Sequence, residues 1–306
     1  MYQYNPSTED LIVRLDDGRN IGYAIYGNPN GYPIFYFHGF PGSRFEGKLI
    51  DEPLKISPFK LYALDRPGIG NSSPQKNRTL LNWADDVREF ADKLKIKRFA
   101  VLGISGGGPY AVVCAYKIPA NRLVATMVVS GMGPAESNKK NMTPLFRAGL
   151  ILAKYSRVLF RLIYRPLFYD KFKTIDRAIK TTWKMIDALM PEEQKLYQVP
   201  KMKEIFVANQ YYGYVQGPEG TAQDVEIYAR PWGFNLEDIP KNAPFLLIHG
   251  EKDNVIPVEM GRYITSRITH CESNFYPNGT HFTTAEYYLK DLFGKVLILF
   301  KKIDSS

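Results

Sequence analysis

One serine of the sequence stands in a setting that suits a nucleophile. Ser105 lies in the stretch GISGGGPYA (103–111), directly after the apolar run RFAVL. A sharp strand-to-helix turn of the form G-x-S-x-G would expose the Ser105 hydroxyl, and a Cβ at Gly103 or Gly107 would collide with the adjacent strand or helix. The Gly106 amide would then lie at a helix N-terminus, where it can donate to a developing oxyanion. The alternative is a tight structural turn, because glycine is the residue such turns favour.

A serine nucleophile needs a base within hydrogen-bonding reach, and the sequence contains four histidines. His38 and His249 end strand-like runs, and we interpret both as structural. His270 stands beside Cys271 at the end of a helical pattern, but nothing positions the pair as a thiol site. His281 lies in a predicted loop, NGTHF, after the last strand. It is therefore the candidate base.

The base in turn needs a carboxylate that fixes its tautomer and stabilises the imidazolium. Asp253 follows the strand-like run that ends near His249, which places it at the same edge of the predicted sheet. Its alternative interpretation is a turn aspartate, since Asp and Asn both favour turns. Asp224 and Asp238 are competitors, but the first lies within a helical insertion and the second precedes the strand. Asp253 is the candidate acid.

Strand and helix patterns alternate over residues 1–133 and again over 235–306. Such alternation predicts a mostly parallel, doubly wound α/β sheet with helices on both faces. In these sheets ligands bind beyond the carboxyl ends of the strands, where the candidate residues stand. The expected strands are 11–15, 20–26, 33–39, 60–68, 98–104, 123–131, 243–250 and 273–277, and the expected helices are 79–94, 109–116, 258–268 and 284–300.

Residues 134–234 form an all-helical insertion, which we predict to be a cap, or lid, over one end of the sheet. Between residues 139 and 184 it holds twelve lysines and arginines against two aspartates, a net charge of +10, whereas the whole chain carries +9. The rest of the chain is therefore nearly neutral. A basic insertion in an otherwise neutral protein argues against a nucleic-acid partner.

Within the insertion, residues 144–165 are predicted to form one basic amphipathic helix that ends at Pro166. Its cations fall within an arc of roughly 80° at 100° per residue; they are Arg147, Lys154, Arg157, Arg161 and Arg165. We favour a lid helix with a solvated charged stripe and its apolar face packed on the sheet domain. The alternatives are an apolar acyl or alkyl pocket, or peripheral docking on an anionic membrane surface.

Composition narrows the class of protein further. The chain has 306 residues, of which 45% are hydrophobic, as in an ordinary soluble globular protein. Its N-terminus lacks a basic region followed by an apolar run, so we expect no secretory signal. The sequence has no run of 18 consecutive apolar residues, so we expect no transmembrane helix. Two cysteines cannot build a disulfide framework, and no metal-ligand spacing, P-loop or dinucleotide fingerprint is present. We therefore expect a cytoplasmic protein without a cofactor or metal.

Taken together, five stretches resemble α/β-hydrolase-fold proteins, in particular the cap-bearing branch that contains esterases and proline iminopeptidases. They are HGFPGSR (38–44), DRPGIGNSS (65–73), GISGGGPYA (103–111), HGEKDNVIP (249–257) and NGTHF (279–283). The resemblance covers nearly the whole chain, and the order Ser105, Asp253, His281 is that of the α/β-hydrolase triad. It implies that the Phe40 amide is the second oxyanion donor and that residues 65–70 form a structural loop near the site.

The resemblance implies a serine hydrolase that cleaves carboxylic esters through an acyl-enzyme on Ser105. The expected substrate is an apolar small molecule, with lipid-like and acyl esters among the candidates. Epoxide hydrolases and haloalkane dehalogenases of this fold use an aspartate nucleophile, so Ser105 argues against both. Iminopeptidases usually carry a bulky aromatic residue where this chain has Gly106, so peptidase activity is not favoured. The alternatives are a lyase or cofactor-free oxygen chemistry on the same triad, and a non-catalytic receptor for a small molecule.

Overall fold

The structure is a computed structural model that describes residues 2–305. Eight strands form one sheet in the order β1-β2-β4-β3-β5-β6-β7-β8. β2 pairs antiparallel with β1 and β4, and all the other pairs are parallel, which confirms the predicted fold class. The strands are β1 (Leu11–Arg14), β2 (Asn20–Gly27), β3 (Tyr32–Phe37), β4 (Phe59–Leu64), β5 (Phe99–Ile104), β6 (Leu123–Val129), β7 (Phe245–Gly250) and β8 (Glu272–Tyr276).

Helices cover both faces of the sheet because the central strands are apolar on both sides. Along β5, Phe99 and Val101 join the core under α3, α4 and α11, whereas Ala100 and Leu102 join the core under α2 and α12. These helices are α2 (Asp51–Lys55), α3 (Leu80–Lys93), α4 (Gly108–Lys117), α11 (Val258–Arg267) and α12 (His281–Asp304), and a short α1 (Pro6–Glu9) precedes β1.

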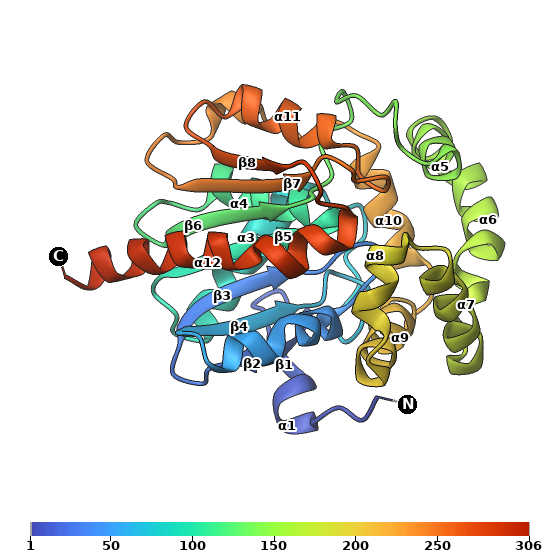
Figure 1. Ribbon diagram of the computed structural model, residues 1–306, viewed down its shortest axis with the longest axis horizontal. Helices are drawn as coiled ribbons and strands as arrows, with labels where there is room; N and C mark the ends of the chain where they lie inside the picture. The colour runs from blue at the N-terminus through green and yellow to red at the C-terminus, as the bar shows by residue number, and fades with distance from the viewer. Residues whose placement is uncertain (1, 306) are drawn as a thin grey trace.

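Residues 130–244, all of which the structure describes, contain helices and loops only. We call the six α-helices of this segment the cap helices; they fall within the predicted insertion, and they gather at one end of the sheet (Figure 1). In Figure 1, α5, α6 and α7 form the outermost layer, and α10 lies closer to the sheet. The cap helices are α5 (Pro144–Tyr155), α6 (Arg157–Leu167), α7 (Ile175–Asp187), α8 (Pro191–Gln194), α9 (Pro200–Gly213) and α10 (Glu219–Tyr228).

The single basic helix expected over 144–165 is wrong, because the chain breaks into α5 and α6 at Ser156. This residue has an extended backbone (φ −146°, ψ 95°), and its hydroxyl accepts a hydrogen bond from the Leu159 amide at 3.3 Å. A serine in this conformation caps a new helix N-terminus. The end predicted at Pro166 is also wrong, because Pro166 lies inside α6, which continues to Leu167.

Candidate active site

The turn after β5 has the strand-turn-helix form that the sequence predicts, but Ser105 is only 8% exposed and faces a cavity, not open solvent. β5 ends at Ile104, a 3₁₀ turn covers Ser105–Gly107, and α4 follows. Ser105 has φ 53°, in the left-handed region that a residue with a side chain adopts at a cost of about 1–3 kcal/mol. A Cβ on Gly103 would lie 2.3 Å from the Gly107 carbonyl oxygen, and a Cβ on Gly107 would lie 2.0 Å from the Phe37 carbonyl oxygen. Both positions therefore require glycine.

The structure brings His281 to this serine. The His281 Nε2 lies 3.0 Å from the Ser105 Oγ, and its Nδ1 lies 2.8 Å from the Asp253 Oδ2. Nδ1–H donates to the carboxylate, which leaves Nε2 free to accept the serine proton. The expected loop position of His281 is wrong, because Thr280 caps α12 by accepting a hydrogen bond from the Thr283 amide at 3.3 Å. His281 is thus the first residue of α12.

Asp253 is held by backbone donors and is buried. Its Oδ1 accepts from the Val255 amide at 2.9 Å and from the Ile256 amide at 2.8 Å. His249, interpreted from the sequence as structural, donates from Nε2 to the Ile256 carbonyl at 2.9 Å and lies 3.3 Å from the Asp253 Oδ2. The Oδ1 of Asp253 is therefore bonded to backbone amides, and its Oδ2 faces the imidazoles of His249 and His281.

The pKa of Asp253 is lowered and that of His281 is raised, as expected when the two groups stabilise each other as an ion pair. Burial by itself raises the pKa of Asp253, but the charge of His281 and the hydrogen bonds from His249 and His281 bring it well below its usual range. Burial likewise lowers the pKa of His281, but the Asp253 charge and hydrogen bond outweigh it, with smaller contributions from Glu193 and Glu46. The pKa of His281 therefore lies above its ordinary value, which suits a base that must hold a proton during a reaction.

The two predicted oxyanion donors lie next to one another beside Ser105. A Cβ built on Gly106 would stand 3.1 Å from the Phe40 nitrogen, and one built on Gly39 would stand 3.4 Å from the Ser105 Cβ. Within residues 2–305 the Phe40 amide has no hydrogen-bond acceptor. A free N–H beside the serine is the geometry an oxyanion site needs.

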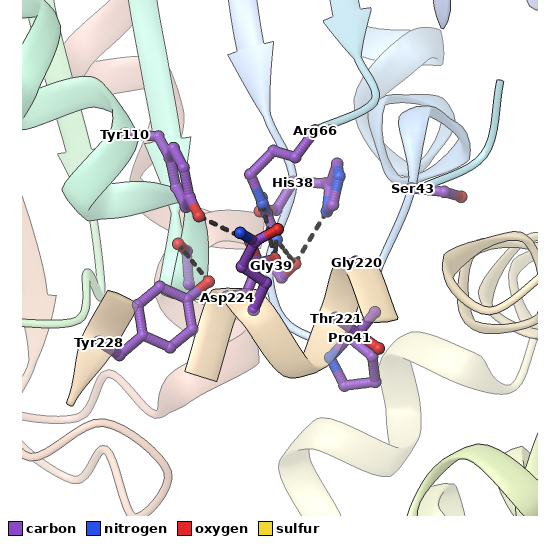
Figure 2. A network of polar contacts seen from close by, with 12 residues as sticks. His38, Gly39, Pro41, Ser43, Arg66, Tyr110, Gly220, Thr221, Asp224 and Tyr228 are labelled. Atoms are coloured by element: carbon purple, nitrogen blue, oxygen red, sulfur yellow. Dashed lines mark hydrogen bonds and ion pairs between the residues drawn. The ribbon is translucent and has the colours of Figure 1, made fainter. Parts of the chain in front are cut away.

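A buried charge network holds the backbone next to Phe40, and sequence reasoning missed it. The Arg66 guanidinium donates to the carbonyl oxygens of His38 and Gly39, the latter at 3.0 Å, and pairs with Asp224 at 2.7 Å (Figure 2). Asp224 also accepts from the Tyr110 hydroxyl at 2.6 Å. No local pattern could join Arg66 to Asp224, because they are 158 positions apart.

Asp224, weighed from the sequence as a rival triad acid, is thus a structural anion between the cap helices and the sheet. Burial raises its pKa, but the charges of Arg66 and Arg78 outweigh burial and lower the pKa to about 2. Asp238, the other rival, is exposed and accepts a hydrogen bond from Asn235 at 3.0 Å.

Two further residues fix the peptide groups around Ser105. The Tyr228 hydroxyl, from α10, donates to the Gly106 carbonyl at 2.9 Å. Glu46 accepts from the Gly39 amide and from the Tyr36 hydroxyl, both at 2.7 Å. Burial raises the pKa of Glu46, although these hydrogen bonds oppose the shift. The Tyr228 contact has no local sequence signal, because it joins residues 122 positions apart, whereas Glu46 lies only seven and ten positions from its two partners.

A cavity of about 420 Å³ opens onto Ser105 and His281. This volume lies in the range of about 300–1,000 Å³ that is common for small-molecule sites. Its wall combines the sheet domain with the cap helices and is mainly aliphatic and aromatic, with Leu49, Ile50, Leu189, Leu196, Phe206 and Phe282 among the lining residues. Within residues 2–305, no cluster of three or more His, Cys, Asp or Glu side chains is arranged to hold a metal ion.

The family described as “alpha/beta hydrolase fold” matches residues 32–286. The chain belongs to the α/β-hydrolase family. It is 25% identical over 256 residues to the “Uncharacterized hydrolase YugF” of Bacillus subtilis (strain 168), a match that covers 80% of this chain and 82% of that protein. It is 31% identical over 116 residues to the “Proline iminopeptidase” of Xylella fastidiosa (strain 9a5c), which covers only 36% of each.

Solved structures place this α/β hydrolase in the same fold as esterases. It matches the esterase RhEst1 from Rhodococcus sp. ECU1013 with a TM-score of 0.66 and 17% identity, over 96% of this chain and 98% of that one. A likeness at this identity shows the fold alone. Family membership and the long match to YugF support a hydrolase.

Proposed function

We propose that this α/β hydrolase cleaves carboxylic esters through an acyl-enzyme on Ser105. The observation that carries the proposal is the chain of contacts from the Ser105 Oγ through His281 to Asp253, at 3.0 and 2.8 Å, on a serine with positive φ. Nucleophile, base and orienting carboxylate in this order are the requirements for acyl transfer.

In the proposed reaction the His281 Nε2 takes the Ser105 proton while the Oγ attacks the ester carbonyl carbon. The carbonyl electron pair moves onto oxygen, and the amides of Phe40 and Gly106 stabilise that oxyanion. Collapse of the intermediate expels the alcohol, which receives its proton from His281. Water, deprotonated by His281, then attacks the acyl carbonyl, and the acid leaves as Ser105 regains its proton. Asp253 stabilises the imidazolium in both halves.

An ester is favoured over a peptide because the cavity wall beside Ser105 is mainly apolar, and the position after Ser105 is Gly106. Esterases are also among the solved structures of the same fold. Two alternatives remain to be distinguished by experiment: a lyase or cofactor-free oxygen chemistry on the same three residues, and a non-catalytic receptor.

The test is hydrolysis of p-nitrophenyl esters of increasing acyl length. Proline p-nitroanilide is included as a substrate that reports peptidase activity. Ser105→Ala should lower ester turnover by at least about 10³-fold without unfolding the protein, since removal of a triad serine has effects of this size or larger. Ser266→Ala, an exposed serine of α11, is the matched control.

A fluorophosphonate probe separates the outcomes. Labelling of the wild-type protein that is lost in Ser105→Ala, together with ester turnover, supports the proposal. Labelling without turnover of any ester favours non-hydrolytic chemistry, and absence of labelling favours a receptor. Faster cleavage of the anilide than of every ester would make the protein a peptidase and overturn the ester assignment.

A further inference from the structure

Exposed apolar side chains gather on the outermost cap helices. Ten of the sixteen large hydrophobic residues exposed within residues 2–305 lie on α5, α6 and α7. A soluble monomer rarely leaves such a concentration uncovered without a use for it. We call its centre the outer cap face; it consists of Tyr155, Val158, Leu159, Leu162, Ile163 and Leu167.

Helix α6 turns its apolar side away from the protein, which is the reverse of the expected packing. At 100° per residue, its exposed apolar residues, from Val158 round to Leu167, span an arc of about 180°, and Val158 and Leu162 are 73% and 67% exposed. Only a narrow strip, Phe160 and Tyr164, is buried.

The charged stripe of α6 is drawn toward the protein instead. Arg157 and Arg161 pair with Glu226 of α10 at 3.4 and 2.7 Å, and Glu226 is buried. A buried carboxylate needs cationic partners, so this contact and the burial of Phe160 and Tyr164 together hold α6 in its rotation about its axis. The apolar arc is left facing outward as a consequence.

Positive charge predominates on α5 and α7, the helices on either side of α6 in Figure 1. Exposed cations stand on both neighbouring helices, among them Arg147 and Lys154 on α5 and Lys180 and Lys184 on α7. The partner should therefore be anionic. A second copy of this chain would bring like charges together, and a nucleic acid would leave the exposed aliphatic side chains without a matching surface.

An anionic lipid bilayer would match both the exposed apolar side chains of this face and the positive charge beside it. A helix with a broad aliphatic arc flanked by lysine and arginine lies in the plane of the interface, with its apolar side among the acyl chains. The exposed aromatic residues Tyr155 and Trp183, which are 76% and 54% exposed, suit the headgroup level. No helix within residues 2–305 is long and apolar enough to cross a bilayer, so this contact would be peripheral.

We propose that the outer cap face docks on anionic lipid membranes, with α6 lying in the interface. The cavity next to Ser105 reaches the surface nearby, since the exposed residues Thr143, just before α5, and Met185 of α7 both line it. An ester dissolved in the bilayer would thus have a short path to the serine; this last step alone rests on the proposed function.

The test is cosedimentation with vesicles of phosphatidylglycerol and phosphatidylcholine, compared with phosphatidylcholine alone. The protein should bind the anionic vesicles at least about tenfold more tightly, because each cation near the surface contributes about a factor of five. Binding should weaken in 1 M salt, where the screening length falls to about 3 Å. Equal binding to both vesicle types, or to neither, would overturn the proposal.

Val158→Asp/Leu162→Asp should weaken vesicle binding by at least about tenfold, since two exposed aliphatic side chains lose their burial in lipid. Both positions are largely exposed, so the fold should persist, which circular dichroism would check. The matched control is Ile56→Asp/Ile298→Asp, at residues 94% and 68% exposed outside the cap helices. Equal loss in both double variants would contradict docking through this face.

Two further measurements distinguish membrane docking from a failure of the proposed hydrolysis and from self-association through this face. Ser105→Ala should bind vesicles as the wild type does, so failure of the proposed hydrolysis leaves the docking test intact. Light scattering of the wild type reports a second copy on the face. A dimer that dissociates in Val158→Asp/Leu162→Asp, without vesicle binding by either protein, would assign the face to self-association and overturn the proposal.

Discussion

Asp224 and Tyr228 lie one turn apart on α10, and each reaches a different segment beside Ser105. Asp224 pairs with Arg66 at 2.7 Å, and Arg66 holds the Gly39 carbonyl at 3.0 Å (Figure 2). The Tyr228 hydroxyl donates to the Gly106 carbonyl at 2.9 Å. Because residues four apart share one helix face, α10 contacts the Gly106 peptide directly and reaches the Gly39 peptide through Arg66. The position of this cap helix is thereby coupled to both proposed oxyanion donors.

Tyr228→Phe should lower kcat for a p-nitrophenyl ester by up to about tenfold and leave KM nearly unchanged. The variant keeps the ring but loses one hydrogen bond, which contributes about 0.5–1.5 kcal/mol. Loss in kcat alone is expected because the Gly106 amide would act on the oxyanion and not on the bound ester. Steady-state kinetics measure the split, with the exposed Tyr287→Phe as control. An unchanged kcat would remove Tyr228 from the positioning of the site.

Asp224→Asn should destabilise the fold by about 3–5 kcal/mol, because it leaves the buried guanidinium groups of Arg66 and Arg78 without a counter-charge. Urea unfolding at neutral pH measures the difference. The pKa of Asp224 is lowered to about 2, so its contribution is present above the unfolded pKa of about 3.9 and is lost as pH falls through the folded value. The difference in the free energy of unfolding between wild type and variant should therefore become smaller at acidic pH. A difference below 1 kcal/mol at pH 7 would contradict this account.

The kcat/KM of ester hydrolysis should fall on the acid side with a midpoint above pH 6.5. His281 acts as a base only when neutral, and its pKa is raised above its ordinary value of 6.5. Glu193→Gln should move the midpoint to lower pH, since the negative charge of Glu193 contributes to the increase. Glu192→Gln, at the neighbouring position, should leave the midpoint near that of the wild type. A midpoint below 6.5 in the wild type would contradict the assignment.

Gly107→Ala should destabilise the protein by at least about 2 kcal/mol, because the new Cβ would lie 2.0 Å from the Phe37 carbonyl oxygen and backbone would have to move. Gly294→Ala is the opposite case. It lies in α12 with nothing within 4 Å of its Cβ position, and the change should stabilise the helix by about 0.5–1 kcal/mol. Thermal unfolding of the two variants compares them directly, and equal shifts would mean that the turn tolerates a side chain.

The alternation of strands and helices and the shape of the turn at Ser105 could be predicted from the sequence, because both follow from local chemistry. Buried strands are short apolar runs, and a G-x-S-x-G turn needs glycine for steric reasons that act within a few residues. Ser105, Asp253 and His281 could be singled out because each follows a strand at the same edge of the sheet. Their catalytic roles remain predictions that the proposed experiments test.

The long-range contacts were decided only by the tertiary structure. Arg66 and Asp224 are 158 positions apart, and no local sequence pattern around either residue predicts that the two are in contact. The rotation of α6 is a similar case. Its residues form an amphipathic pattern whichever way the helix faces, and the pattern alone suggested that the apolar side is buried. Glu226, buried on α10, pairs with Arg157 and Arg161. Phe160 and Tyr164 are buried, and the rest of the apolar side faces outward. A periodic pattern defines the two sides of a helix, but the partner that the fold brings to it decides which side meets solvent.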